Sequence, residues 1–257
     1  MEPTPAEGTL RKTALVTGVG RLAGIGAGIA RLLAADGWDL VLTYWQDYDA
    51  RMPWGIQPDD VVRLTAELEA IGARVHTLPA DLQDPASADR LMAQATRLAG
   101  PLQAMVLSHT ESVASGIMDT TLEAFERHFA VNTRASWQLI AAFARQATAD
   151  GGAIVALTSD HTEFNLPYGA SKGALDRIVI AAARELGPLG ISANVLNPGP
   201  VDTGWMDREL REELSRRQPA GRLGTPADVA GTVAFLVSPA GRWVSGQLIK
   251  SDGGFSA

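Results

Sequence analysis

The sequence predicts a single α/β domain built on an open, doubly wound parallel sheet of about seven strands, with helices on both faces. Three observations predict it. Short, continuous apolar runs alternate along the chain with longer helical patterns, as expected when the strands of a parallel sheet are buried on both faces. The length of 257 residues suits one large core. No internal repeat or low-complexity block interrupts the alternation, and right-handed crossovers then favour an open sheet.

The strands are β-rich runs such as TALVT and DLVLTY, bounded by glycine, proline or polar turns. We expect them, in chain order, at 13–17, 39–44, 74–79, 104–108, 153–158, 192–196 and 247–250. The segments between them have the apolar spacing of helices, and Gly72 and Gly100–Pro101 stop two of them. The expected helices are 25–35, 59–71, 86–98, 121–149, 171–186, 207–216 and 226–236.

Two segments stand apart from this rhythm. Residues 1–10 have weak patterning and are interpreted as an N-terminal tail, which leaves 11–257 as one domain. The connection 45–58, WQDYDARMPWGIQP, is unusually long. Loops of this length are commonly functional or disordered, and its two Trp and one Tyr argue against plain disorder.

Composition narrows the class of protein. The chain has no Cys, which excludes disulfides, thiolate metal sites and Cys nucleophiles. A net charge of −7 argues against nucleic acid or an anionic membrane as partner. No apolar run is long enough for a membrane span, and the acidic start does not have the pattern of a signal peptide, so we expect a cytoplasmic protein. Asp160 beside His161 could suggest a metal, but no ligand spacing supports one, and we expect none.

A glycine-rich loop, TGVGRLAGIGAG at 17–28, follows the first strand and opens the first helix. Glycines in this place let the backbone approach a pyrophosphate, and the helix N-terminus offers free N–H groups. The chain has no Gly-Lys-Ser/Thr of a P-loop, so a dinucleotide is favoured over a nucleoside triphosphate. A tight turn that binds no ligand is the alternative.

The end of the second strand bears on the choice of cofactor. An acidic side chain there would bind the ribose 2′-OH and repel a 2′-phosphate. The sequence reads Thr43-Tyr44-Trp45, with no carboxylate before Asp47. Arg21 and Arg51 are candidate phosphate partners, although either could be a solvated surface cation. NADPH is therefore preferred, and NADH remains possible.

Tyr168 and Lys172 are four residues apart, which places them on one face of a helix. A free phenol has a pKa near 10, and a nearby ammonium favours the phenolate and lowers that pKa toward the working range. The Ser159 hydroxyl could hold a substrate carbonyl for hydride attack. Taken alone, such a pair could also be an ordinary surface contact.

At this point the chain resembles the short-chain dehydrogenase/reductase family over nearly its full length, and is similar to its 3-oxoacyl-[acyl-carrier-protein] reductase-like members. The resemblance rests on TG and GIG after the first strand, on Asn132 in FAVN, and on YGASK at 168–172. NPGPVDT at 197–203 and the tail GRLGTPADVA to SGQLIKSDGG complete it. It implies a Rossmann fold and an oxidoreductase that moves a hydride between nicotinamide and a carbonyl or secondary alcohol.

The resemblance also implies residue roles. Tyr168 looks like the catalytic acid/base, and Lys172 like the lysine that lowers its pKa and binds the nicotinamide ribose. Ser159 looks like the substrate-orienting hydroxyl, and Asn132 like the residue that holds a water in the proton relay. Besides Tyr168 and Lys172, the implied cofactor contacts are Gly18, Gly20, Arg21, Gly24, Ile25, Gly26, Tyr44, Asp81, Leu82, Ser108, Pro198, Gly199, Val201 and Thr203. Helices such as 171–186 make tetramer interfaces in the family, so a homo-oligomer, tetramer or dimer, is expected.

Three departures from the family pattern leave alternatives open. Five residues separate Gly18 from Gly24, a gap that resembles the enoyl-acyl-carrier-protein reductase branch. That branch places six residues between Tyr and Lys, whereas three stand here, which favours carbonyl chemistry. Ser159 precedes Tyr168 by only nine positions, so Thr158 is an alternative orienting hydroxyl. The fourth strand ends in Ser-His-Thr rather than an Asn-Asn-Ala-Gly-like turn.

Two other readings of function are kept: an enoyl-thioester reductase-like activity, and a catalytically silent dinucleotide sensor or scaffold. The histidines His109 and His161 could touch substrate or be satisfied within loops. Trp205 and Met206 fall where the family often has a mobile substrate lid, although a hydrophobic surface helix explains them equally well.

Overall fold

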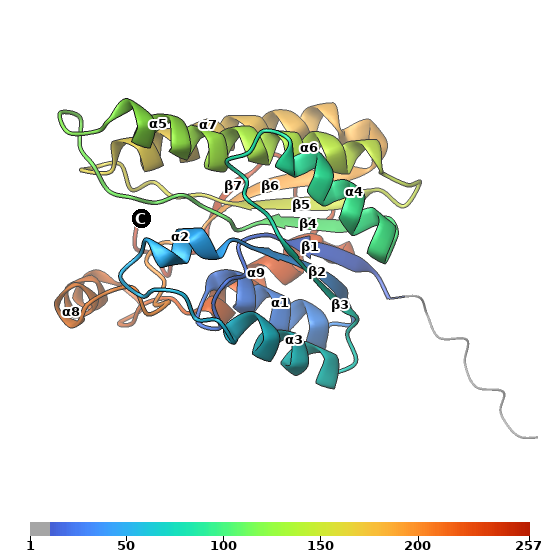
Figure 1. The fold of residues 1–257 in the computed structure, drawn as a ribbon, viewed down its shortest axis with the longest axis horizontal. Helices are drawn as coiled ribbons and strands as arrows, with labels where there is room; N and C mark the ends of the chain where they lie inside the picture. The colour runs from blue at the N-terminus through green and yellow to red at the C-terminus, as the bar shows by residue number, and fades with distance from the viewer. Residues whose placement is uncertain (1–10) are drawn as a thin grey trace, which may run out of the picture.

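The computed structural model describes residues 11–257, so the expected tail at 1–10 lies outside the described residues. These residues form one parallel sheet of seven strands in the order β3-β2-β1-β4-β5-β6-β7 (Figure 1). The strands are β1 Thr13–Val16, β2 Asp39–Tyr44, β3 Val75–Pro79, β4 Ala104–Leu107, β5 Gly152–Leu157, β6 Ile191–Asn197 and β7 Leu248–Lys250. The predicted doubly wound parallel sheet is confirmed.

Helices cover both faces of the sheet (Figure 1). They are α1 Ile25–Ala35, α2 Gln46–Ala50, α3 Asp60–Ala70, α4 Ser87–Ala99, α5 Leu122–His128, α6 Ser136–Arg145, α7 Leu166–Glu185, α8 Arg208–Arg217 and α9 Pro226–Val237, with a π-helical turn at Phe129–Ala135 and 3₁₀ turns at Gly187–Leu189 and Pro239–Gly241. None of the helices within residues 11–257 combines the length and apolar character that crossing a bilayer requires.

The inner strands β2, β1, β4, β5 and β6 contribute to two separate cores because successive side chains point to opposite faces. In β1, Ala14 and Val16 pack with α1, α3 and α9, whereas Leu15 packs with α4, α6 and α7. Both cores are filled by fully buried aliphatic side chains. The continuous apolar runs of the sequence are thus explained by burial on both sides.

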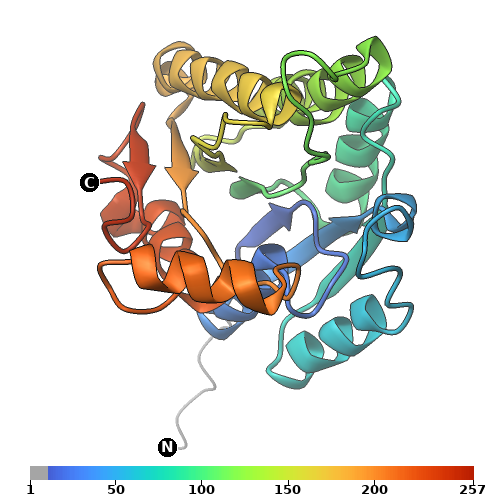
Figure 2. The ribbon, with the colours of Figure 1, turned by 90° about the vertical axis from the view of Figure 1, so that its left-hand side faces the viewer.

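Three predicted elements differ from the structure. The helix expected at 121–149 is divided into α5, the π turn and α6, and it ends at Arg145. The helix expected to begin at Ser171 begins five residues earlier, at Leu166, because Pro167 suits a first helical turn. The connection 45–58 contains the short helix α2. The parallel strands all end on the same side, from which Figure 2 views the molecule.

Candidate functional site

The glycine loop lies between the carboxyl ends of β2 and β4, the two neighbours of β1 in the sheet. Gly18 has a φ of +74°, and a Cβ there would lie 2.7 Å from backbone atoms of Ser108 and His109. The next residue, Val19, donates its N–H to the Thr43 carbonyl at 2.8 Å. Only glycine fits the first of these positions, so the loop is fixed against both neighbouring strands.

The N-terminus of α1 fits the phosphates of a dinucleotide. Its N-cap, Gly24, supplies no side-chain hydrogen bond, and the first turn carries no acidic residue. The first N–H groups of the helix therefore have no side-chain acceptor of their own at the cap. A Cβ on Gly26 would lie 2.9 Å from the Gly18 carbonyl oxygen, so the loop and the helix approach one another closely. Both features suit a pyrophosphate held by backbone N–H groups.

Tyr168 and Lys172 occupy the first two turns of α7, with the ammonium 5.8 Å from the centre of the phenol ring. Lys172 is buried and donates from Nζ to the Leu157 carbonyl at 2.9 Å. Burial lowers the pKa of Lys172 to about 8, although the Asp176 carboxylate acts in the opposite direction. The sequence thus correctly places the pair on one helix face.

The direction of the Tyr168 pKa differs from the sequence argument. Burial raises the pKa of this phenol above its usual value, and a hydrogen bond with the Ser159 side chain opposes that rise. The expected lowering by Lys172 is not found: loss of hydration on burial, which penalises the phenolate, is the largest effect, and Ser159 is the group that opposes it. Without other groups in the cleft, Tyr168 is a protonated phenol at neutral pH.

The two candidate orienting hydroxyls point to different places. Ser159 interacts with the Tyr168 phenol and also accepts a hydrogen bond from the His161 backbone N–H at 3.1 Å. Thr158 is buried, and its hydroxyl donates to the Lys172 backbone carbonyl at 3.5 Å instead. The geometry therefore favours Ser159 as the hydroxyl that shares a reacting oxygen with Tyr168.

Asn132 is buried within the π-helical turn that follows α5. Its Oδ1 accepts the Glu111 backbone N–H at 2.7 Å, and its Nδ2 donates to the Glu111 carbonyl and to Ser171 Oγ, both at 2.9 Å. Ser171 Oγ in turn donates to the Tyr168 backbone carbonyl at 2.8 Å. Asn132 thus joins the segment after β4 to the first turn of α7. π-Helical turns are frequent at functional sites.

His109 is a buried structural group rather than a residue at the mouth of the cleft. Its Nε2 lies 3.1 Å from the Val131 carbonyl, which can only accept, so Nε2 carries the hydrogen. Nδ1 therefore accepts from the Thr17 hydroxyl at 2.7 Å. Burial, helped by Lys172, lowers the pKa of His109 to about 3. His161, by contrast, is exposed on the loop after β5.

Both arginines that were candidates for phosphate binding have protein partners. Arg21 donates to the Thr203 carbonyl at 3.2 Å, and its guanidinium lies 4.3 Å from the Trp54 ring centre. Arg51 makes two hydrogen bonds with the Glu111 carboxylate, at 3.0 and 2.8 Å. Neither is a freely solvated surface cation.

The other implied cofactor residues lie after the carboxyl ends of their strands. Tyr44 ends β2, and Asp81 and Leu82 follow β3. After β6, Gly199 adopts a φ of +61° and Thr203 is buried. Within residues 11–257, no group of three His, Asp or Glu side chains is arranged to hold a metal ion.

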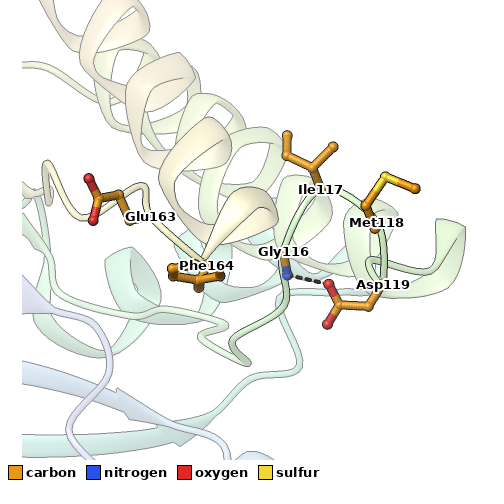
Figure 3. Close-up of a pocket in the computed structure, with 6 residues that line it drawn as sticks. All are labelled: Gly116, Ile117, Met118, Asp119, Glu163 and Phe164. Carbon is orange, nitrogen blue, oxygen red and sulfur yellow. Dashed lines mark hydrogen bonds between the residues drawn. The ribbon is translucent and has the colours of Figure 1, made fainter.

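An apolar cavity of about 450 Å³ lies between the loops that follow β4 and β5 (Figure 3). It is lined by Gly116, Ile117, Met118, Asp119, Glu163 and Phe164. Phe164 has a φ of +52°, and its side chain is 85% exposed. A hydrogen bond of 2.8 Å from the Leu166 N–H to the Ser115 carbonyl joins the two loops. Apolar side chains held open to solvent suit a hydrophobic ligand.

Three further residues of this region have contacts that local sequence patterns do not reveal: Glu111, Tyr48 and Ser171. Glu111 is buried, and an acidic side chain is seldom fully buried unless it is paired. Tyr48 belongs to the long 45–58 connection. The aromatic residues of this connection indicate order, but they do not indicate which segment it contacts. Ser171 belongs to the YGASK motif and is the expected first residue of the helix 171–186, without a role of its own in the sequence pattern.

Comparison with known proteins places the chain among oxidoreductases. A family model described as enoyl-(acyl carrier protein) reductase matches residues 18–256. The uncharacterized oxidoreductase YjdA of Bacillus subtilis is 33% identical over 251 residues, covering 95% of this chain and 96% of the relative. Versicolorin reductase 1 of Aspergillus parasiticus is 34% identical over 265 residues, covering 95% of each chain. A short chain dehydrogenase from Burkholderia cenocepacia, solved with NADP, is 33% identical with a TM-score of 0.84, covering 96% of this chain and 98% of that one.

Proposed function

The chain belongs to the short-chain dehydrogenase/reductase family, and we propose that it is an NADPH-preferring oxidoreductase that interconverts a ketone and a secondary alcohol. When bound, NADPH supplies the hydride that is added to the carbonyl carbon. Tyr168 donates the proton that the carbonyl oxygen gains, and Ser159 holds that oxygen by a hydrogen bond. A 3-oxoacyl compound is one substrate that fits this chemistry.

The observation that carries the proposal is the Lys172 ammonium 5.8 Å from the centre of the Tyr168 ring, with Ser159 close enough to the phenol to oppose the rise of its pKa. Two neighbouring hydroxyls can both donate to a single carbonyl oxygen. Because burial raises the pKa of Tyr168, the phenol keeps its proton at neutral pH until the substrate oxygen becomes basic. Lys172, with a pKa of about 8, is largely charged there and favours the phenolate that remains.

The preference for NADPH rests on charge. β2 ends at Tyr44, and Trp45 follows, so neither residue at its end is an acid that would repel a 2′-phosphate. The Asp49 carboxylate that lies against the glycine loop accepts from Trp54 and faces Arg21. Arg21 lies in the glycine loop, which follows the neighbouring strand β1, and is the candidate cation for that phosphate. The solved relative from Burkholderia cenocepacia holds NADP. NADH remains a possible cofactor.

Enoyl-thioester reduction is the second candidate, favoured by the description of the matching family model and by the five-residue gap in the glycine loop. The spacing of Tyr168 and Lys172 and the contact between Ser159 and Tyr168 favour carbonyl chemistry instead. Matched 3-oxoacyl and 2-enoyl thioesters of one chain length, tested side by side, separate the two activities. Preferred turnover of the enoyl thioester would contradict the first proposal.

Tyr168→Phe tests the proposed role of the phenol. It should lower kcat at least about 10³-fold, because the proton donor is lost, while the affinity for NADPH changes less than about twofold. NADPH fluorescence gives the affinity, and loss of absorbance of the reduced nicotinamide over a panel of ketones gives the turnover. Equal turnover by the variant would refute the role of Tyr168. Binding of NADPH by the wild type with no turnover of any carbonyl or enoyl compound would point to a silent sensor.

We also propose that the protein is a homo-oligomer, a dimer or a tetramer. Two large aromatic side chains support this: Trp137 on α6 is 55% exposed, and Trp243 in the turn before the edge strand β7 is 98% exposed. Exposed indoles of this kind are enriched at interfaces between proteins. Light scattering on the purified chain gives the mass of the assembly, and a monomer at all concentrations would contradict the proposal.

A further inference from the structure

The segment after β2, residues 45–56, is called the strap here. It contains α2 and lies beside the carboxyl ends of the strands (Figure 1). Tyr48 and Trp54 pack together within it, with their ring centres 6.3 Å apart. Burial, with a contribution from Glu111, raises the pKa of Tyr48, and the Tyr168 phenol adds to this rise. The strap therefore extends from the end of β2 toward the proposed catalytic groups.

The strap is tied to the far side of the glycine loop. Arg51 follows β2, and its guanidinium makes two hydrogen bonds, at 3.0 and 2.8 Å, with the carboxylate of Glu111, which follows β4. β2 and β4 are the two neighbours of β1, and the glycine loop follows β1. A link between the ends of β2 and β4 therefore has to cross the carboxyl end of β1. In an open α/β sheet, this is the crevice in which a nucleotide binds.

The strap also packs directly on the glycine loop. A Cβ on Gly20 would lie 2.7 Å from Asp49 Oδ2, so the Asp49 carboxylate lies directly against this glycine. Trp54 Nε1 donates to Asp49 Oδ1 at 2.8 Å, and the Arg21 guanidinium stacks 4.3 Å from the Trp54 ring centre. Asp49 and Trp54 thus hold the strap against the glycine loop, and Arg51, which lies between them in the sequence, links it to Glu111.

The link has one fixed end and one movable end. The Glu111 side chain is 4% exposed, and its backbone is held by both polar atoms of the Asn132 side chain. The Arg51 side chain is 40% exposed and lies on the strap. Removing the cation would leave a buried carboxylate without its partner, which is strongly unfavourable. The ion pair therefore favours the closed strap.

We propose that Arg51 and Glu111 are positioning residues that clasp the strap across the dinucleotide crevice, so that the cofactor enters and leaves only when this ion pair opens. The inference rests on the proposed function, because it assigns the crevice to NADPH. Closed, the clasp excludes water from the cofactor and keeps it in place. Opening exposes the glycine loop and exchanges the ion pair for hydration of both partners.

Two measurements test the clasp. The first is amide hydrogen exchange of the cofactor-free protein, in which Arg51→Met should raise exchange of the 45–56 amides about tenfold or more. The second is stopped-flow chase of bound NADPH by excess NADP⁺, in which the same variant should raise the dissociation rate of NADPH about tenfold or more. Glu111→Gln should act in the same direction, and Arg51→Lys, which keeps one charge but not the two-point contact, should be intermediate.

Arg145→Met is the matched control, because it removes the same side chain from an exposed ion pair with Asp89 between α4 and α6. It should change neither the exchange nor the NADPH dissociation rate. Thermal unfolding of each variant verifies that it is folded. Unchanged strap exchange in folded Arg51→Met and Glu111→Gln would overturn the clasp whether or not NADPH binds. Increased exchange with an unchanged dissociation rate of bound NADPH would show that the strap opens without controlling cofactor release, and would also overturn it. Failure of wild-type protein to bind NADPH would instead refute the proposed function and, with it, the assignment of the crevice.

Discussion

Replacing Lys172 by Met should stabilise the fold at pH 7 while removing activity. The ammonium is buried, and burial lowers its pKa to about 8. In an unfolded chain a lysine titrates near 10.4, so keeping this ammonium charged in the native state at pH 7 costs about 3 kcal/mol. Met has a similar length and no charge, so the substitution removes this cost.

The Leu157 carbonyl would lose its donor, which costs about 1 kcal/mol, and a net gain of about 2 kcal/mol at pH 7 remains. The gain depends on pH in a definite direction. Between about pH 8 and 10.4 the unfolded chain still holds the lysine proton while the native protein has released it, so the wild type gains stability as pH rises. Between pH 7 and 9.5 the advantage of Lys172→Met should fall by about 2 kcal/mol.

Urea denaturation of both proteins at pH 7, 8.5 and 9.5, with the same buffer ions, gives the two free energies of unfolding. NADPH is left out, because any ligand that binds the native state would add its own stabilisation. A difference between the proteins that stays constant over this pH range would refute the assigned pKa of Lys172. A variant less stable than the wild type at pH 7 would show that the contact with Leu157 outweighs the burial of charge.

Two further predictions concern the same end of the sheet. Ser159→Ala should lower kcat about 10²-fold or more, because one donor to the reacting oxygen is lost. Thr158→Val should lower kcat less than about tenfold. The reverse order in steady-state kinetics would assign the role to Thr158. His109, with a pKa of about 3, should stay neutral with its hydrogen on Nε2 at pH 5 in nitrogen NMR. Between about pH 6.5 and 3 only the unfolded chain binds a proton at this histidine, so the stability that neutral His109 contributes is lost as pH falls through this range. A protonated His109 at about pH 5 in the folded protein would contradict the assignment.

The sequence was sufficient for features that depend on local spacing. The seven strands follow from short apolar runs, and the common face of Tyr168 and Lys172 follows from their separation by four residues. It could not predict contacts that join distant segments. Arg51 and Glu111 are 60 residues apart, and nothing in either neighbourhood identifies the other as its partner. The pKa of Tyr168 was predicted in the wrong direction because burial depends on the whole assembled cleft.

The division between α5 and α6 was also beyond the sequence. FAVNTRA has ordinary helical residue types, and the turn makes contacts that no local pattern reveals, from the Val131 carbonyl to His109 and from Asn132 to Glu111. The start of α7 was missed for a different reason, since Asn165 and Pro167 are recognisable as helix-start residues only once the loop before them is known to end there.

The π turn affects how the helical segment formed by α5, the turn and α6 tolerates the insertion or deletion of a residue. Each residue of an α-helix rotates the direction of its side chains by about 100°, so an added or lost residue normally re-aims everything beyond it. A wide turn accommodates one additional residue locally, and the rods on either side keep their orientation toward the sheet. Loss of a residue between 129 and 135 would therefore redirect the Asn132 amide while α6 still buries Leu139 and Phe143. The direction of the Asn132 side chain can therefore change without a change in the packing of α6 against the sheet.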